Sequence, residues 1–405
     1  MKPSILRKQF LQHVAQTSPA PMLVEVSRAE GACFYTPEGK RYFDLVAGVS
    51  VSNVGHANPS VVRAVQEQAA RYMHVMVYGE LVEAPQVRLA ARLAGLLPGG
   101  LESVYFLNSG AEAVEGALKL AKRATGRTEL ISMRRAYHGS THGVMSLMGS
   151  PEGEEWKEAF RPLLPDTQSI EFNDFRALER ITRRTAAVLV EPVQGEAGVR
   201  LPAEGYLQAL RRRCDEVGAL LIFDEIQTAM GRTGTLFAME RYGVVPDIVC
   251  LAKALGGGMP LGAFVAPHAL MDTLQHDPVL GHITTFGGHP VCCAAGLAAL
   301  EYILDNDLPA AAAAKGALYE SLLADHPAVC EIRRAGLLLA VELGRSDRLY
   351  RIMELFKEVG IMSDWFLFCD TAFRISPPLV ISEEEVRASA ALIREALDRV
   401  AAELP

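Results

Sequence analysis

The sequence predicts an α/β protein with a large domain, in which a mostly parallel sheet lies between helices, and a smaller α+β domain. In the middle of the chain, short apolar runs alternate with amphipathic helical patterns, which is typical of parallel strands covered on both faces. The last third mixes long helical patterns with a few strand-like runs, which is typical of an α+β domain. A chain of 405 residues has room for both.

The elements follow one another in the order that this fold requires. A strand is expected at 40–45, at the end of the N-terminal segment. The buried strands of the large domain are expected at 103–107, 129–132, 186–190, 220–223 and 248–252, with helices at 112–123 and 206–217. In the last third we expect helices at 290–305, 311–323 and 383–404, and strands at 337–341 and 373–376. The large domain is therefore placed at residues 46–290, and the smaller one at 1–45 together with 291–405.

Composition argues against several classes of function. The formal net charge is −8, so no basic excess points to nucleic acid or to an anionic membrane surface. No apolar run approaches the ~18 residues that a membrane span needs, and the N-terminus does not resemble a secretory signal. The seven cysteines are scattered and include no CxxC pair, which suits a reducing cytosol better than a disulfide framework or a zinc site. We expect a cytoplasmic protein that binds neither membranes nor nucleic acid.

Small residues follow the strand at 103–107 and open the next helix. In the run Asn-Ser-Gly-Ala-Glu-Ala at 108–113, Ser109, Gly110 and Ala111 would let backbone amides approach an anion at the helix N-terminus. The alternative is an ordinary helix cap, because serine is a frequent N-cap residue. Taken alone, the motif leaves both interpretations open.

Two charged residues follow apolar strands at positions where an isolated charge is costly. Asp224 ends the strand at 220–223, and its carboxylate could pair with the pyridinium nitrogen of pyridoxal phosphate (PLP) or serve as a structural ion pair or helix cap. Lys253 follows the strand at 248–252 and precedes three glycines at 256–258. A desolvated lysine amine can form a Schiff base with an aldehyde, whereas the alternative is a surface lysine beside a flexible loop.

A fourth feature is the run Tyr137-His138-Gly139, where an aromatic side chain at a strand–loop junction could stack on a flat heterocycle. His138 and His142 have the spacing of a metal pair, but no third ligand lies nearby, so we expect no metal site. Together the four features supply a phosphate cradle, a ring stacker, a pyridinium partner and a Schiff-base lysine. Asp224 and Lys253 are 29 positions apart, which is the reach of one βαβ unit.

The ordered set of motifs resembles the class III aminotransferases, PLP enzymes of fold type I that include the ornithine, acetylornithine and 4-aminobutyrate aminotransferases. The motifs, in family order, are NSGAEA, YHG, EPVQGEAG, LIFDEIQTAMGRTG, LAKALGGG and TTFGGHP. The resemblance extends from FDLVAGVSVSNVGHANPSVVRAV near the N-terminus to FRISPPL near the C-terminus.

The resemblance implies a role for each matching residue. Lys253 would hold the cofactor and act as the general base, Asp224 would pair with the ring nitrogen, and Tyr137 would stack on the ring. The phosphate would be held by Ser109, Gly110 and Ala111. The remaining implied cofactor contacts are His138, Glu191 beside Asp224, Gln227 at the phenolic oxygen, and Thr285 at the phosphate of the neighbouring subunit of a homodimer.

The resemblance also implies how substrates bind. Arg374 would grip a substrate carboxylate, and Glu196 would neutralise that arginine when an amine end enters; the alternative for this pair is an interdomain salt bridge. Many relatives have an arginine directly after His-Gly, whereas this chain has Ser140, so the acceptor could be 2-oxoglutarate or pyruvate, and Arg135 could replace the missing arginine.

The expected reaction is ping-pong transfer of an amino group from an amino acid or terminal amine to an oxo acid. A PLP-dependent racemase or aminomutase on the same scaffold is the alternative, because it would keep the same core residues.

Overall fold

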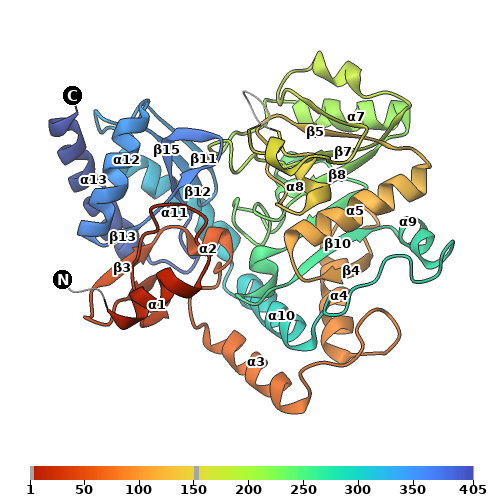
Figure 1. Ribbon diagram of the computed structural model, residues 1–405, viewed down its shortest axis with the longest axis horizontal. Coiled ribbons are helices and arrows are strands. Elements are labelled where there is room, and N and C mark those ends of the chain that lie inside the picture. The colour runs from red at the N-terminus through yellow and green to blue at the C-terminus, as the bar shows by residue number, and fades with distance from the viewer. Residues whose placement is uncertain (1–3, 150–154, 405) are drawn as a thin grey trace.

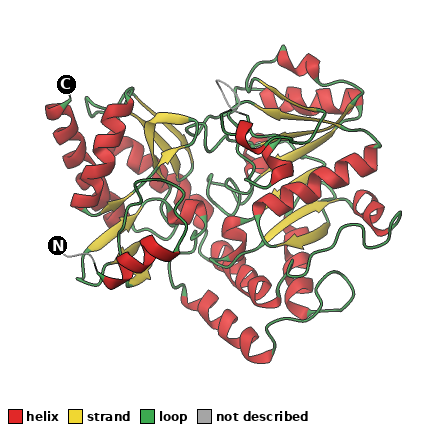
Figure 2. Cartoon of the chain, in the orientation of Figure 1, coloured by secondary structure: helices red, strands yellow, loops and turns green. Residues whose placement is uncertain are grey.

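The computed structural model describes residues 4–149 and 155–404, which form three sheets and the helices around them. Figure 1 shows two parts lying side by side. One part contains the largest sheet and its helices, and the other brings the N-terminal and C-terminal segments of the chain together. Figure 2 shows that strands form the interior of both parts and that helices cover them.

The large sheet confirms the predicted mostly parallel arrangement. Its strand order is β4 (Ser103–Leu107), β10 (Gly262–Ala266), β9 (Ile248–Leu251), β8 (Leu220–Asp224), β7 (Thr185–Val190), β5 (Glu129–Met133) and β6 (Thr167–Ile170). The neighbours from β9 to β6 pair in parallel, whereas β10 runs antiparallel to both β4 and β9. The chain therefore reverses once in this sheet, at a strand that the sequence patterns did not single out.

Both faces of the large sheet are covered, as near-continuous apolar strands require. Ile222 and Cys250 belong to the core beneath helix α5 (Gly110–Thr125). Leu221 and Phe223, which point the other way, pack in the core that includes α7 (Tyr206–Val217) and α4 (Ala84–Leu96). The alternation along each strand thus separates two cores, and only the strand ends remain open to a ligand.

Further helices surround this part. α10 (Pro290–Asp305) packs against α3 (Pro59–Arg71), α4 and η3 (Lys253–Gly256). The short elements of the same region are α2 (Ala47–Ser50), α6 (His142–Met145), α8 (Ala238–Tyr242), α9 (His268–Met271), η1 (Glu158–Phe160), η2 (Ala177–Arg180) and η4 (Asp272–Gln275).

Two four-stranded sheets form the second part. The first joins both ends of the chain in the order β1 (Arg28–Glu30), β2 (Cys33–Tyr35), β3 (Arg41–Asp44) and β13 (Ile361–Met362). The second has the order β11 (Glu331–Ala335), β12 (Leu338–Glu342), β15 (Cys369–Ile375) and β14 (Trp365–Phe366). The surrounding helices are α1 (Ile5–His13), α11 (Leu308–Leu323), α12 (Ser346–Val359) and α13 (Glu383–Glu403). Helix α13 starts with a capping box, in which Ser382 and Glu385 exchange backbone and side-chain hydrogen bonds.

The predicted elements lie close to their expected positions. The largest difference is at β15, which begins at Cys369 rather than at 373, and the next is at the helix α11. This helix begins at Leu308 rather than at 311, because a proline is tolerated in the first helical turn, where its missing N–H has no helical partner. The antiparallel pairing of β1–β3 and the pairing of β3 with β13 place the N-terminal segment beside the C-terminal third. The domain boundaries at 46 and 290 stay a prediction. Within the described residues, no helix is long and apolar enough to cross a membrane.

Two helical glycines allow a matched test of this packing. A Cβ on Gly316, in α11, would overlap the backbone oxygen of Gly336 in the turn between β11 and β12, whereas a Cβ on Gly95, in α4, would have no neighbour within 4 Å. We expect Gly316→Ala to destabilise the protein by about 1–3 kcal/mol through overpacking. Gly95→Ala should stabilise it by about 0.5–1 kcal/mol. Thermal unfolding midpoints measure both, and equal shifts would contradict the close contact.

Candidate active site

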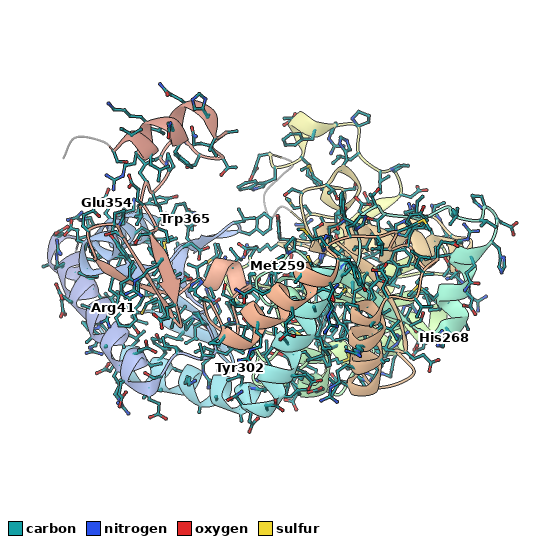
Figure 3. All side chains as sticks on the ribbon, turned by 90° about the horizontal axis from the view of Figure 1, so that it is seen from below. Arg41, Met259, His268, Tyr302, Glu354 and Trp365 are labelled. Atoms are coloured by element: carbon teal, nitrogen blue, oxygen red, sulfur yellow. The ribbon has the colours of Figure 1, made fainter. Side chains whose placement is uncertain are left out.

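A cavity of about 490 Å³ lies at the carboxyl ends of β4, β8 and β9, where the open edge of a parallel sheet forms ligand sites. Nine of the twelve sequence-predicted site residues line it: Ser109, Gly110, Ala111, Tyr137, His138, Glu191, Asp224, Gln227 and Lys253. They come from five separate segments of the chain. Met259, another lining residue, lies near the centre of the molecule in the view from below (Figure 3).

The register of two parallel strands brings Asp224 and Lys253 together. Asp224, the last residue of β8, pairs with Cys250 of β9, and Lys253 follows three positions later. The backbone of Lys253 has φ 49°, in the left-handed region that residues other than glycine rarely adopt. Such strain is found at functional sites, where the surrounding structure imposes the conformation.

Asp224 is held from two directions. Its Oδ1 accepts a hydrogen bond from the backbone N–H of Ile226 at 3.0 Å, and its Oδ2 lies 2.7 Å from Nδ1 of His138. Both side chains are almost fully buried. The second ring nitrogen of His138 has no hydrogen-bond partner within residues 4–149 and 155–404. A buried carboxylate fixed in this way can face a cation in the cavity.

Lys253 lies where its amine loses its charge easily. Burial lowers the pKa of this amine below its ordinary value, although the negative charge of Glu196 opposes the shift. A lysine with a lowered pKa presents more neutral amine, which is the nucleophilic form.

The N-terminus of α5 forms a close-fitting wall of the cavity. Ser109 is the N-cap residue, and its Oγ accepts a hydrogen bond from the backbone N–H of Glu112 at 3.2 Å. The helix-cap interpretation of this motif is therefore confirmed, and the phosphate interpretation stays a prediction that is compatible with it, because a helix N-terminus also favours an anion. A Cβ on Gly139 would come within 2.7 Å of Ala111, and one on Gly262 would overlap the backbone oxygen of Ser109. The backbone segments therefore approach one another too closely for side chains.

Glu191 and Gln227 complete the lining next to Asp224. The carboxylate of Glu191 accepts hydrogen bonds from the backbone N–H groups of Gly195 and Tyr137, at 3.1 and 3.3 Å. Burial raises the pKa of Glu191 to about 7, and the charge of Asp224 adds to this effect while His138 opposes it. Gln227 is nearly buried, and its Nε2 lies 3.5 Å from Oγ of Ser50.

Arg374 and Glu196 form the ion pair that the sequence suggested, but neither lines the cavity. Nη2 of Arg374, on β15, donates to Oε1 of Glu196 at 2.8 Å, and both side chains are buried. Burial works against the charged form of Glu196, but Arg374 outweighs it and lowers the pKa of this carboxyl. The pair joins β15 to the segment that follows β7, so it spans the two parts of the molecule.

Of three other positions that the sequence analysis discussed, one lines the cavity and two do not. Ser140 lines the cavity, with its Oγ 3.1 Å from the hydroxyl of Tyr137. Arg135 lines a different, more polar cavity with Arg200 and Arg333, so it does not fill the place of the missing arginine. Thr285 is exposed, between η4 and α10, and does not line the cavity.

Some residues of the site were missed by the sequence analysis. The side chain of Ile226 lines the cavity, and its Cδ1 would lie 2.9 Å from a Cβ on Gly110. Asp364 bonds Nε of Arg374 at 2.9 Å. The position of Ile226 two residues after Asp224 could have indicated its place, whereas the contact of Asp364 depends on how β14 pairs with β15, where the register shifts.

The chain is similar to known proteins along most of its length. The family model for aminotransferase class-III matches residues 14–397. The chain is 43% identical to an acetylornithine aminotransferase of Methanopyrus kandleri, over 91% of this chain and 92% of that one. It is 42% identical to a putrescine aminotransferase of Pectobacterium atrosepticum, over 89% and 79%. In structure it is similar to the ornithine aminotransferase of Toxoplasma gondii ME49, with a TM-score of 0.90 at 33% identity, over 98% and 95% of the two chains.

The chain belongs to the class III aminotransferases. It is a PLP-dependent transaminase with fold type I, as its sequence predicted. Neither the racemase nor the aminomutase alternative is represented by the relatives named above.

The polar groups that line the cavity of this class III aminotransferase fit PLP. The N-terminus of α5 offers backbone N–H groups to a phosphate, and the glycines beside it let the surrounding backbone pack closely against that helix end. Asp224 presents a carboxylate for the ring nitrogen, and Lys253 a readily neutralised amine for the aldehyde. These protein groups therefore match the phosphate, the ring nitrogen and the aldehyde of this cofactor.

We expect His138 to position Asp224. His138→Phe removes the 2.7 Å contact but keeps a ring of similar size, at a cost of about 1.5–3 kcal/mol, or roughly 10- to 100-fold in kcat. His142→Phe is the matched control, because the His142 side chain is exposed and bonds the backbone oxygen of Pro162 rather than a residue of the cavity. Steady-state kinetics compares the two, and equal losses would contradict a positioning role.

Proposed function

We propose that the twelve predicted residues act in this transaminase as their motifs imply, with Lys253 as its catalytic base. The observation that carries the proposal is the convergence of Lys253, Asp224 and the N-terminus of α5 on one cavity. When bound, PLP supplies an aldehyde that takes up the amino group and a ring that withdraws electrons.

Each residue then has a definite task. Lys253 would hold the cofactor through a Schiff base, and its Nζ, once displaced by the amino donor, would move the proton from the donor carbon. Asp224, fixed by His138 and the Ile226 amide, would keep a proton on the ring nitrogen. Tyr137 would stack on the ring, and Gln227 would bond its phenolic oxygen. The N-terminus of α5 would hold the phosphate through Ser109, Gly110 and Ala111.

Arg374 and Glu196 would set how the two substrates bind. While Arg374 is paired with Glu196, its charge is neutralised, and a donor that carries no carboxylate at this end can bind. When Glu196 moves away, the arginine can bind the carboxylate of an oxo acid. The donor would be an amino acid or terminal amine, and the acceptor 2-oxoglutarate or pyruvate. The two half-reactions would alternate in a ping-pong mechanism.

The Schiff-base role of Lys253 has a direct test. Lys253→Ala should remove turnover and the absorbance band of the lysine-bound cofactor, because no other amine lines the cavity within the described residues. Lys122→Ala, on α5 outside the cavity, should keep both. Absorbance and a donor screen against both oxo acids measure these properties, and repeated turnover by Lys253→Ala would refute the assignment.

Ser140 offers a test of the acceptor. Because Ser140 lines the cavity beside Tyr137, Ser140→Arg should place a guanidinium where the distal carboxylate of 2-oxoglutarate would lie. We expect the preference for 2-oxoglutarate over pyruvate to rise by roughly tenfold or more, as a charge-assisted hydrogen bond would give. Competition between the two oxo acids measures the preference, and an unchanged ratio would exclude this position as an acceptor determinant.

We further infer a cytoplasmic homodimer with shared active sites. The support for the shared site is the exposure of Thr285 on its own chain, with the exposed Phe286 and Ile283 beside it. Exposed apolar side chains that adjoin one another are typical of interaction surfaces. The support for the cytosol is that all seven cysteines are free thiols.

Complementation between two inactive variants tests the shared site. Lys253→Ala lacks the Schiff base, and Thr285→Asp would repel the phosphate of the site that it serves. If Thr285 serves the partner, a mixed dimer has one intact site and one site with both defects. Separately tagged, co-purified heterodimers should then regain about half of the wild-type activity, because one of two sites is intact. Heterodimers as inactive as their parents would place Thr285 at its own site.

A further inference from the structure

The backbone makes a strained turn between β3 and the cavity of Lys253. Consecutive φ angles of 51°, 63°, 63° and 62° occur at Ala47, Gly48, Val49 and Ser50, which form the short element α2. Glycine adopts this left-handed region readily, whereas a β-branched residue such as Val49 is a marked outlier there. Such a conformation persists only where the surrounding structure imposes it, and it is typical of functional sites. Residues 47–50 are called the left-handed turn below.

Buried contacts hold this turn at both ends. At its start, Oδ1 of Asp44 accepts hydrogen bonds from the backbone N–H groups of Val46 and Ala47, at 3.0 and 2.8 Å. At its end, the hydroxyl oxygen of Ser50 lies 2.9 Å from that of Ser376, the residue that follows β15. Both serines are almost fully buried. The place of the Ser50 hydroxyl is therefore set by two segments that lie far apart in the chain.

The hydrogen bonds around Ser50 have one consistent direction. The hydroxyl of Ser376 donates to the backbone oxygen of Val46, at 3.5 Å, because a carbonyl oxygen can only accept. Ser376 is then free to accept the hydrogen of Ser50. Having donated its own hydrogen, the Ser50 oxygen can accept one from Nε2 of Gln227, which lies 3.5 Å away. The chain of donors thus begins at Gln227, in the wall of the cavity.

The amide of Gln227 is also confined on its other side. Its Oε1 lies against the backbone of Gly195, where an added Cβ would overlap this oxygen. The amide nitrogen therefore lies toward Ser50 and the oxygen toward Gly195. An amide nitrogen carries two hydrogens, so one N–H stays available to a ligand when the other is bonded to Ser50. The left-handed turn itself packs against η3, the element that begins with Lys253.

We infer that Ser50, held by the left-handed turn and by Ser376, is a positioning residue that orients the Gln227 amide so that an N–H faces the phenolic oxygen of the cofactor. This inference rests on the proposed role of Gln227 at that oxygen. Neither serine lines the cavity, so both act through Gln227. Without the acceptor at Ser50, the amide can turn over and present its own oxygen, which a negatively charged phenolic oxygen would repel.

The orientation of Gln227 has an effect that can be measured without substrate. In the bound cofactor, the phenolic oxygen attracts the proton on the Schiff-base nitrogen of Lys253. An N–H donated by Gln227 stabilises the negative charge on this oxygen and so weakens its attraction for the proton. Loss of that donor should therefore raise the pKa of the Schiff base. The absorbance band of the lysine-bound cofactor changes with this proton, so a pH titration reports the pKa.

The test is a pH titration of the holoenzyme in the absence of substrate. Ser50→Ala should raise the midpoint by about half a pH unit or more, as expected for the loss of one hydrogen bond. Alanine is compatible with this backbone, since Ala47 adopts it in the same turn. Ser376→Ala leaves the sequence of the turn unchanged and should shift the midpoint in the same direction, but less. Gln227→Leu should raise it at least as much as Ser50→Ala.

A third serine provides the matched control. Ser389, on α13, is also fully buried and its hydroxyl lies 2.7 Å from that of Tyr319, but it does not line the cavity. Ser389→Ala should leave the midpoint at its wild-type value, and thermal unfolding compares the stabilities of the variants. All these variants keep the charged groups that act on the amine of Lys253, namely Glu196, Arg374, Asp224 and Glu191.

The outcomes separate the inference from the proposed function. The inference is overturned if Ser50→Ala leaves the midpoint unchanged or lowers it, or if Ser389→Ala shifts it equally. A shift in Gln227→Leu without one in Ser50→Ala would reject the role of Ser50 and leave that of Gln227 standing. No shift in Gln227→Leu would reject both roles. Transamination by the wild type is measured separately, so it stands or falls independently of these midpoints.

Discussion

The parallel pairing of β8 with β9 is the constraint on which the rest of the site depends. It places Asp224 opposite Cys250, and Lys253 directly beyond the end of the neighbouring strand. Because both faces of the sheet are packed with apolar side chains, the strand ends are where a polar ligand can approach. The same edge receives the N-terminus of α5, so a carboxylate, an amine and an anion site meet in one cavity.

Electrostatics within the cavity follow from this burial. Burial lowers the pKa of Lys253 and raises that of Glu191, so both side chains are more easily neutral than they would be in water. Asp224 is also buried, but His138 and a backbone N–H bond it directly. The local hydrogen bonds thus assign different tasks to two carboxylates that lie close together. One is fixed to face a cation, and the other organises the backbone at Tyr137 and Gly195.

The buried ion pair of Arg374 and Glu196, proposed above to bind substrates, joins the two parts of the molecule. Arg374 comes from β15 of the second part, and Glu196 from the segment after β7 of the first. Breaking a buried ion pair by removing one partner is costly, so this contact also restrains how the two parts lie against each other. If Arg374 binds substrates as proposed, substrate binding and the relative placement of the two parts are coupled through one guanidinium.

The sequence by itself determined the local elements and the residues at their ends. Apolar runs identified β4, β8 and β9, and the positions of Asp224 and Lys253 after them followed directly, because strand patterns and helix starts depend on neighbours along the chain. Only the tertiary structure decided the reversed strand β10, the bond between His138 and Asp224, and the second carboxylate on Arg374. These contacts join segments far apart in the chain, or cross a shift in strand register, and their energies depend on packing that no local pattern contains.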